Sequence, residues 1–379
     1  MEDLKQIMPK KLGFGCMRLP VANGNSEEID DAVFCRMIDR YMEQGFVYFD
    51  TAYPYHNQKS EEAVRRCLVE RYDRERFLLA DKMPVWLVQN MEDYSEIFER
   101  QLARCGVTYF DFYLFHAMNK TRVEETEKTG GFAFVQRMKT EGRIRHIGFS
   151  FHDTAEALEE ILKNHPEMEF VQLQINYLDW ESLGVQSRKC YEVAVQHGKP
   201  VIVMEPVKGG TLAKVPAPVE RLFKQAHPDW SVPSWAVRFA ASLDQVMVVL
   251  SGMSSLEQME DNTGYMQHFA PLTPSEKELV ARAMEIINQS IAVPCTGCSY
   301  CTEGCPQNIP IPRYFSLYNA DLQEDKDKGW LPQGTYYDNL TLTHGKAGDC
   351  IACGQCEGVC PQHLPIIEDL KRVARHFEA

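Results

Sequence analysis

Eight short apolar runs alternate with segments of helical periodicity along the first 290 residues of this 379-residue chain. Several runs are apolar at nearly every position, as expected for strands that are buried on both faces. Between them, apolar residues recur every three to four positions, as in the stretch from Asp153 to His165. The eight runs are Leu12–Leu19, Val47–Ala52, Phe77–Met83, Phe110–His116, Ile144–Ser150, Phe170–Tyr177, Val201–Val207 and Val246–Gly252.

This alternation predicts an α/β protein with a TIM (β/α)8 barrel, because eight strand–helix units over roughly 250 residues are typical of that fold. A doubly wound open sheet is the alternative. It calls for a G-x-G-x-x-G fingerprint after the first strand, and GFGCMR does not match it. We therefore expect a barrel over residues 1–290 and a second domain over residues 291–379, with chemistry at the C-terminal ends of the strands.

Polar residues follow three successive strand runs: Asp50 and Tyr55, then Lys82, then His116. Each alone has an ordinary structural explanation, as a helix cap, a rim residue or a hydrogen-bonded core residue. Together they suit protonation of a carbonyl oxygen. Tyr55 would be the acid, Lys82 would lower the pKa of its phenol, Asp50 would anchor Lys82, and His116 would position the substrate.

The motifs FDTAYPYHN, ADKM and FYLFH, in this order, resemble those of the aldo-keto reductases over roughly residues 10 to 290. The resemblance implies a (β/α)8 barrel, a catalytic set of Asp50, Tyr55, Lys82 and His116, a small-molecule substrate, and NADPH or NADH as cofactor. It assigns Ser150 and Gln172 to the nicotinamide carboxamide and Met204 to stacking on the nicotinamide. The loop with Gly209 and Gly210 matches the pyrophosphate loop, and the turn with Gln258 and Asn262 matches the adenosine site.

The sequence departs from the family pattern at the positions that distinguish the two dinucleotides. Gly252 and Gln258 stand where the family usually offers a Lys or Arg to the 2′-phosphate of NADPH. Lys208 would compensate only if its loop folds back. The choice between NADH and NADPH is therefore open at this point. Phe151 also follows Ser150 where the family usually has Asn.

Eight of the thirteen cysteines lie in two runs near the C-terminus, PCTGCSYCTEGCP and DCIACGQCEGVCP. Both have the spacing C-x2-C-x2-C-x3-C-P, which is that of bacterial two-cluster ferredoxins. Structural zinc is the alternative, but zinc sites usually separate two C-x2-C pairs by a dozen or more residues. We therefore predict two 4Fe-4S clusters.

In two-cluster domains the fourth cysteine of each run binds the other cluster. One cluster would take Cys295, Cys298, Cys301 and Cys360, and the other Cys350, Cys353, Cys356 and Cys305. The spacer over residues 306–349 is longer than in a compact ferredoxin. PRYFSLYNADLQ and DLKRVARHFE have helical periodicity, so the domain resembles the α-helical ferredoxins of fumarate reductase-type subunits. The polar segment QEDKDKGWLPQGTYYDN is predicted to be an exposed loop.

The composition limits the partners and the cellular location that we expect for this protein. A formal charge of −14 argues against nucleic-acid and anionic-membrane partners. The N-terminal residues lack the apolar run of a signal peptide, and no apolar stretch is long enough for a membrane span. We therefore expect a cytoplasmic protein without a disulfide scaffold. Its five other cysteines should be reduced and buried: Cys16, Cys35, Cys67, Cys105 and Cys190.

These features favour an NAD(P)H-linked reductase that carries a ferredoxin-type domain. Three roles are open for the clusters: electron exchange with a redox partner protein, redox sensing, and structural support of the C-terminus. A nicotinamide moves two electrons as hydride whereas each cluster moves one, so coupling them calls for a flavin or a radical. A barrel mouth can hold a flavin without a signature, and nothing in the sequence supports one. The alternatives are an electron-transfer or redox-sensing protein with the barrel as a platform, and a cluster-driven reductase. The substrate and the oligomeric state are not readable from the sequence.

Overall fold

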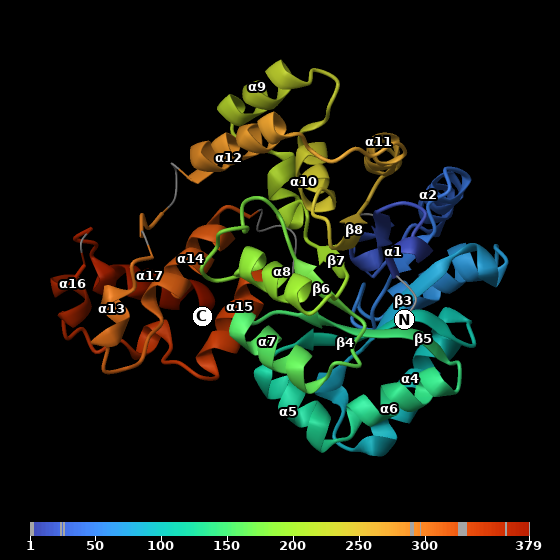
Figure 1. Cartoon of the computed structure of the whole chain (residues 1–379), viewed down its shortest axis with the longest axis horizontal. Helices are drawn as coiled ribbons and strands as arrows, with labels where there is room; N and C mark the ends of the chain where they lie inside the picture. The colour runs from blue at the N-terminus through green and yellow to red at the C-terminus, as the bar shows by residue number, and fades with distance from the viewer. Residues whose placement is uncertain are drawn as a thin grey trace.

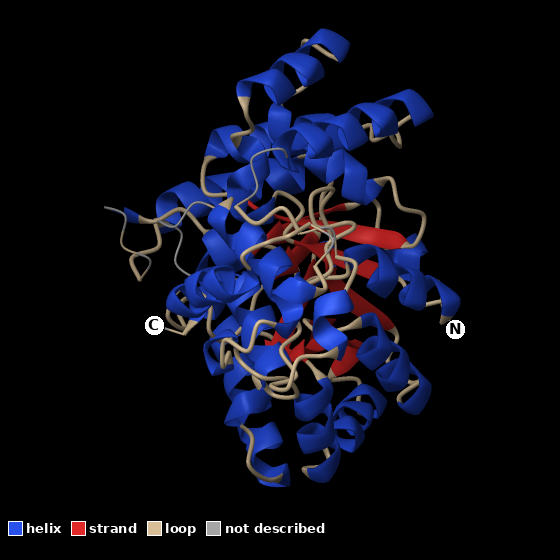
Figure 2. Cartoon of the chain, turned by 90° about the vertical axis from the view of Figure 1, so that its left-hand side faces the viewer, coloured by secondary structure: helices blue, strands red, loops and turns tan. Residues whose placement is uncertain are grey.

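A computed structural model describes residues 4–22, 25, 27–288, 292–295, 297–324, 332–360 and 362–378. Its eight parallel strands close into a barrel in the order β1 to β8, which confirms the predicted fold. Figure 2 shows the strands at the centre, surrounded by helices. The strands are β1 (Leu12–Gly15), β2 (Tyr48–Asp50), β3 (Leu78–Met83), β4 (Phe110–Met118), β5 (Ile144–Phe151), β6 (Phe170–Gln174), β7 (Val201–Met204) and β8 (Val246–Gly252).

The first domain has helices around the barrel, most of which pack on the outside of the strands (Figure 1). They are α1 (Leu4–Ile7), α2 (Asp31–Glu43), α3 (Ser60–Val64), α4 (Met91–Cys105), α5 (Lys120–Lys128), α6 (Gly131–Thr140), α7 (Ala155–Asn164), α8 (Ser187–Gln196), α9 (Ala217–Ala226), α10 (Val232–Ala241), α11 (Leu256–Met266) and α12 (Pro274–Asn288). Short 3-10 turns are η1 (Cys16–Arg18), η4 (Arg74–Arg76), η5 (Val85–Leu87) and η6 (Lys208–Ala213), and a π-helical turn, η3 (Arg65–Val69), extends α3. The boundary predicted at residue 290 lies outside the described residues.

Local sequence signals explain where individual helices begin and end. Asn90 caps α4 in a capping box with Asp93, and Gly106 ends the helix with a φ of 72°. The N-cap of α7 is Thr154, the residue after Asp153. The Thr154 side chain accepts the N–H of Ala157, so a hydroxyl one position later does the capping.

The core has two layers around the strands. Inside the barrel, large apolar side chains of alternate strands fill the space, among them Tyr48, Phe112, Phe170 and Val248. The outer layer packs the strands against the helices. Gly148 of β5 leaves room for this filling, because a Cβ there would lie 2.6 Å from the carbonyl oxygen of Phe170.

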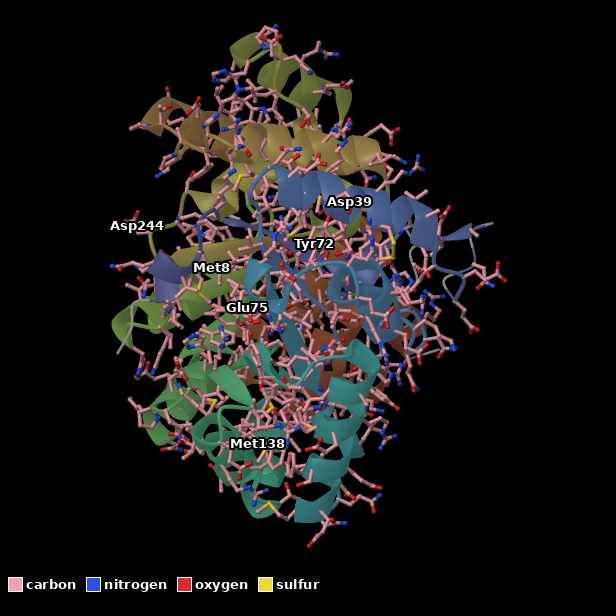
Figure 3. The ribbon with its side chains drawn as sticks, turned by 90° about the vertical axis from the view of Figure 1, so that its right-hand side faces the viewer. Met8, Asp39, Tyr72, Glu75, Met138 and Asp244 are labelled. Carbon is pink, nitrogen blue, oxygen red and sulfur yellow. A yellow bond between two sulfur atoms is a disulfide. The ribbon has the colours of Figure 1, made fainter. Side chains whose placement is uncertain are left out.

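A disulfide joins Cys35 of α2 to Cys67 of η3. The prediction that both thiols are free is therefore wrong, because the closed barrel brings two neighbouring helical segments together, which sequence separation does not reveal. Tyr72 adds to this contact by donating a hydrogen bond to Asp39, and both residues are labelled in Figure 3. The other three isolated cysteines are buried and free, as expected: Cys16, Cys105 and Cys190.

The C-terminal domain is helical, as predicted. Its elements are α13 (Tyr300–Glu303), α14 (Ile311–Leu322), α15 (Pro332–Thr341), η8 (Ala347–Asp349), α16 (Gln355–Gly358) and α17 (Ile366–Phe377). Part of the predicted exposed loop, over 325–331, lies outside the described residues. Of the rest, Gln323 and Glu324 form a turn after α14, where Glu324 is buried, and 332–339 lie in the helix α15. Tyr336 and Tyr337 of α15 are buried. The polar residues around them in the sequence made this segment look like an exposed loop.

This domain packs against the loops at the C-terminal ends of β4, β5 and β6, to one side of the barrel mouth (Figure 1). Asn339 of α15 accepts a hydrogen bond from Asn119 at 2.7 Å and donates one to the carbonyl oxygen of His152 at 2.6 Å. The loop after β6 meets α14 so closely that a Cβ on Gly184 would lie 2.6 Å from Leu317. Among the described residues, no helix is both long and apolar enough to cross a membrane.

Candidate functional site

The four predicted catalytic side chains meet at the mouth of the barrel. Asp50 ends β2, Lys82 lies in β3, His116 lies in β4, and Tyr55 stands in the loop after β2. The Lys82 ammonium donates to Asp50 Oδ1 at 2.5 Å, to the Thr51 carbonyl at 2.8 Å and to the Tyr55 hydroxyl oxygen at 3.3 Å. Lys82 and Asp50 are buried, whereas Tyr55 is partly exposed and therefore faces the opening.

The electrostatics of Tyr55 differ from the prediction. Burial raises the pKa of the Tyr55 phenol, and the attraction of the Lys82 ammonium only partly opposes this effect. Burial also works against the charge of Lys82, but Asp50 and Tyr55 outweigh it and raise the pKa of the ammonium. At neutral pH the pair is therefore a protonated phenol beside a charged ammonium. Lys82 therefore acts in the predicted direction, but the burial of the phenol is the larger effect and the net shift of its pKa is upward.

His116 stands beside Tyr55, with 6.1 Å between the two ring centroids in an edge-on arrangement. Burial lowers the pKa of the imidazole, and the positive charge of Lys82 adds to this effect, so the ring is neutral near pH 7. Its Nδ1 atom is buried and has no hydrogen-bond partner among the described residues. The site thus holds a neutral imidazole with unused hydrogen-bonding capacity beside a phenol.

A buried polar network behind Lys82 was not anticipated from the sequence. Gln101 of α4 donates to the Lys82 carbonyl at 3.0 Å and to Glu61 at 3.2 Å. Arg104 pairs with Glu61 at 2.7 Å. Burial raises the pKa of Asp81 and that of Glu61, and the two carboxyl groups lie in one network. The signal that could have revealed it is an acidic residue, Asp81, inside an apolar strand.

Two of the predicted carboxamide-binding residues lie side by side. Ser150 of β5 and Gln172 of β6 are paired in strand register. The Ser150 hydroxyl accepts the Ala117 N–H at 2.7 Å, and the Gln172 amide donates to Asp50 Oδ2 at 3.1 Å. Met204 ends β7 opposite Gln174 and is partly exposed at the mouth. These positions agree with the resemblance, and the roles assigned to them stay predictions.

The loop after β7 folds around an ion pair across the barrel mouth. Gly209 and Gly210 have φ values of 61° and 96°, a conformation that glycine adopts readily. The Glu205 carboxylate accepts the Gly209 N–H at 2.5 Å and pairs with Arg18 at 2.8 Å. Arg18, which the sequence did not single out, passes over Gly252, where a Cβ would lie 3.3 Å from its own Cβ.

Lys208 does not reach the adenosine turn. Its ammonium is buried and pairs with Asp179 at 2.8 Å and with Glu324 of the C-terminal domain at 3.4 Å. The loop therefore does not fold back in the way that would let Lys208 take the place of the missing Lys or Arg at the 2′-phosphate of NADPH. At the turn itself, Gln258 is exposed at the start of α11. Asn262 is buried, donates to Ser251 and accepts from the Tyr265 hydroxyl at 2.6 Å.

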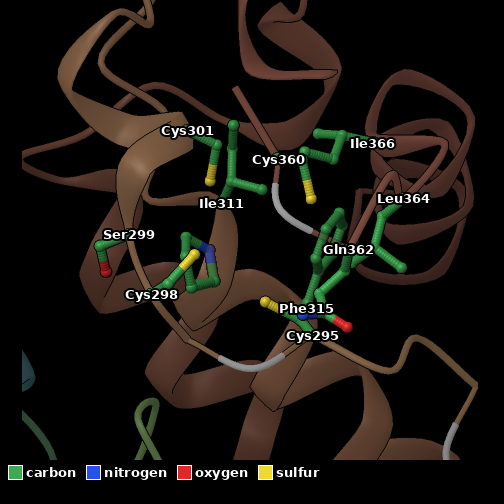
Figure 4. Close-up of a pocket in the computed structure, with 11 residues that line it drawn as sticks. Cys295, Cys298, Ser299, Cys301, Ile311, Phe315, Cys360, Gln362, Leu364 and Ile366 are labelled. Atoms are coloured by element: carbon green, nitrogen blue, oxygen red, sulfur yellow. The ribbon is translucent and has the colours of Figure 1, made fainter. Parts of the chain in front are cut away.

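The eight clustered cysteines border two cavities in the C-terminal domain. Figure 4 shows the first, into which cysteines of both runs point. It is lined by Cys295, Cys298, Cys301 and Cys360. The second is lined by Cys305, Cys350, Cys353 and Cys356. The two sets are those that the crossed-ligand pattern predicts, with the fourth cysteine of each run facing the other cavity.

The surroundings of the first cavity suit an iron–sulfur cluster. Ile311, Phe315 and Ile366 provide an apolar wall, and the Gly297 N–H points at the Cys295 sulfur at 3.4 Å. Among the described residues, no three His, Cys, Asp or Glu side chains form a group that could hold one metal ion. A cubane differs from such a site because its four ligands bind four different iron atoms and stand farther apart.

A parallel eight-stranded barrel with a Tyr–Lys–Asp–His set at its mouth defines the class of the first domain. The model of the aldo/keto reductase family matches residues 11–285, and that of the 4Fe-4S dicluster domain matches residues 294–364. The chain belongs to the aldo/keto reductase family. It is an oxidoreductase enzyme that carries a 4Fe-4S dicluster domain at its C-terminus.

Known relatives agree with this assignment. An uncharacterized oxidoreductase of Schizosaccharomyces pombe, C215.11c, is 25% identical over 265 residues, covering 68% of this chain and 81% of that protein. Two solved structures share the fold. Aldo-keto reductase AKR11C1 of Bacillus halodurans, in its holo form, is 24% identical with a TM-score of 0.58, covering 72% of this chain and 91% of that one. An aldo-keto reductase of Klebsiella pneumoniae in complex with NADPH is 19% identical with a TM-score of 0.57, covering 72% and 90%.

Proposed function

We propose that this enzyme reduces a small carbonyl compound with NADH or NADPH, with Tyr55 as the proton donor. The observation that carries the proposal is the contact of the Tyr55 hydroxyl with the Lys82 ammonium, 3.3 Å apart at the barrel mouth. The bound nicotinamide would supply a hydride to the carbonyl carbon. Ser150, Gln172 and Met204 would hold its ring, and the loop with Gly209 and Gly210 its diphosphate.

The residues of this chain explain how the proton would move. The raised pKa of Tyr55 keeps the phenol protonated until a carbonyl oxygen becomes basic enough to take its proton. The phenolate left behind would be stabilised by Lys82, whose charge Asp50 holds in place. A neutral His116 can donate a hydrogen bond to the same oxygen and fix its direction.

A Tyr55→Phe variant tests this proposal. Loss of the acid should lower kcat for aldehyde reduction by about 10²- to 10⁴-fold, the usual contribution of a positioned general acid. Tyr53→Phe is the matched control, since Tyr53 lies in the same loop and contacts Arg104 instead. Equal activity of Tyr55→Phe and wild type would exclude Tyr55 as the donor. Measuring KM for NADH and for NADPH in the wild type decides between the cofactors.

We further propose that the two cavities hold two 4Fe-4S clusters that exchange electrons with a partner protein. Four cysteines border each cavity, and three large apolar side chains within the two runs are exposed: Tyr300 at 59%, Ile351 at 59% and Val359 at 52%. Exposed apolar groups near a redox centre suit a transient protein contact. The charge of −14 supports a protein partner over a nucleic acid or an anionic membrane.

The exposed side chains near the cysteine runs also support a second candidate function, in which electron transfer is the main activity and the barrel a cofactor platform. Mixing the anaerobic holoprotein with NADH or NADPH in a stopped-flow instrument separates the two. Bleaching of the cluster absorption would support coupling of the nicotinamide to the clusters. Turnover of an aldehyde without bleaching would support the reductase alone. Bleaching without turnover of any aldehyde would support the electron-transfer candidate.

A further inference from the structure

Arg122 of α5 is a cation at the barrel mouth that the proposed reaction does not use. Three other cations at the mouth are each committed to an acidic residue: Lys82 to Asp50, Arg18 to Glu205 and Lys208 to Asp179. Among the described residues, no carboxylate lies within ion-pair distance of the Arg122 guanidinium. Glu125, one turn further along α5, acts on it only at longer range.

The position of Arg122 is fixed relative to the catalytic groups. Its Nη1 atom donates to the Ala117 carbonyl at 2.6 Å, and the N–H of Ala117 in turn donates to Ser150 at 2.7 Å. This bond uses one of five guanidinium N–H donors. Burial lowers the pKa of Arg122, so the charge is partly removed from water without a counter-ion.

An aromatic side chain connects Arg122 to the catalytic histidine. The guanidinium lies 5.3 Å from the centroid of the Trp86 ring, and that ring lies 5.2 Å from the centroid of His116. His116 is next to Tyr55. A proton donor, an imidazole, an indole and a cation therefore follow one another across the mouth. Trp86 is 41% exposed, so a ligand can reach this surface.

We propose that Arg122 binds a carboxylate of the substrate, so that the enzyme prefers carbonyl compounds with an acid group beyond a short flat or apolar linker. The carbonyl would lie at Tyr55 and His116, the linker against Trp86, and the carboxylate at Arg122. A guanidinium forms strong paired hydrogen bonds with a carboxylate. Because the chain carries a formal charge of −14, its overall field does not attract anions, and binding one calls for such a local cation.

This inference rests on the proposed reduction. In that reaction a hydride from the nicotinamide forms the new C–H bond and the proton of Tyr55 forms the new O–H bond. The carbonyl π bond breaks, the nicotinamide is oxidised, and water returns a proton to Tyr55. The substrate's carboxylate takes no part in the bond changes, so Arg122 acts on binding and orientation.

Two isosteric aldehydes, 4-formylbenzoate and 4-formylbenzamide, test the inference, since they differ only in the charge of the distant group. For the wild-type holoenzyme we expect kcat/KM to be about 10- to 100-fold higher for the acid. Arg122→Gln should remove most of this ratio, mainly through KM, and Arg122→Lys should keep part of it. Lys120→Gln is the control, since it removes one charge from the start of α5, where Lys120 pairs with Glu160.

A ratio near one for the wild type, or an equal loss for both aldehydes in Arg122→Gln, would overturn the inference. A binding measurement separates it from the proposed function. Calorimetric titration with benzene-1,4-dicarboxylate should show binding to the wild type and to Tyr55→Phe, and at least tenfold weaker binding to Arg122→Gln. Such binding without reduction of either aldehyde would contradict the proposed function alone. Equal binding by wild type and Arg122→Gln would contradict the anion site.

Discussion

Glu324 gives the contact between the two domains a pH dependence that can be measured. The residue is 6% exposed, and burial raises the pKa of its carboxyl group to about 7, with Lys208 only partly opposing this. The folded protein therefore binds a proton here at pH values where the unfolded chain, with an ordinary glutamate pKa of about 4.3, has lost it. The free energy of unfolding should fall as pH rises from about 4.5 through 7.

The size of the effect follows from the shift. The shift from about 4.3 to about 7 corresponds to about 4 kcal/mol at most, since each pKa unit is worth about 1.4 kcal/mol. Glu324→Gln removes the titration. The variant should match the wild type near pH 5 and exceed it at pH 8.5 by at least about 1 kcal/mol, a rise of about 2–4 °C in Tm. Lys208→Met should instead lower the free energy of unfolding by about 3–5 kcal/mol, because it leaves the buried Asp179 without its cation.

The assay is thermal unfolding of the anaerobic holoprotein between pH 5 and 8.5, followed by near-UV circular dichroism and by cluster absorption. Glu285→Gln, an exposed glutamate on α12, is the control and should track the wild type at every pH. If the Tm difference between Glu324→Gln and the wild type stayed constant across this range, the carboxyl group would not titrate there. The reasoning about the buried triad of Lys208, Asp179 and Glu324 would then be refuted.

Two further changes test the C-terminal domain. Cys360→Ser should lower the iron content of the purified protein by about half, and the site lost should be the one bordered by Cys295, because Cys360 faces that cavity; an unchanged iron content would count against the crossed ligand sets. The side chain added by Gly184→Val should clash with Leu317 of α14 and lower the free energy of unfolding by about 1–3 kcal/mol, measured as a lower Tm. Gly264→Ala is the control, because nothing lies near its Cβ position. An equal effect of the two substitutions would show that the interface is not tightly packed.

The barrel could be predicted from the sequence because its strands are buried on both faces, so each strand is a nearly continuous run of apolar residues, as in Phe110–His116. The catalytic side chains could be found for a related reason, since polar residues such as Asp50 stand out at the ends of such strands. No comparable sequence pattern indicates the contacts between segments that are distant along the chain. The disulfide of Cys35 and Cys67 and the ion pair of Lys208 and Glu324 depend on how helices and domains pack.

The pKa of Tyr55 shows a different limit. The sequence identifies Lys82 as a neighbour, but the sign of the shift depends on how much water the folded site excludes, and burial is the larger effect. The helix α15 was missed because few of its buried residues are strongly apolar: Leu340 is, but Gln333 is polar and Tyr336 is amphipathic. A helix is predicted from sequence by a stripe of apolar residues. The face of α15 that covers the barrel loops consists largely of polar and amphipathic side chains instead.

The interleaving of the two cysteine runs has a consequence for the order of events during synthesis. Cys360 borders the first cavity and Cys305 the second, so each site needs residues from both ends of a segment that spans residues 295–360. The ribosome releases the barrel well before this segment is complete. The second proposed cluster site lacks a ligand until residue 356 has emerged, and the first until residue 360. The barrel can therefore fold first, and insertion of the proposed clusters must follow translation of nearly the whole chain.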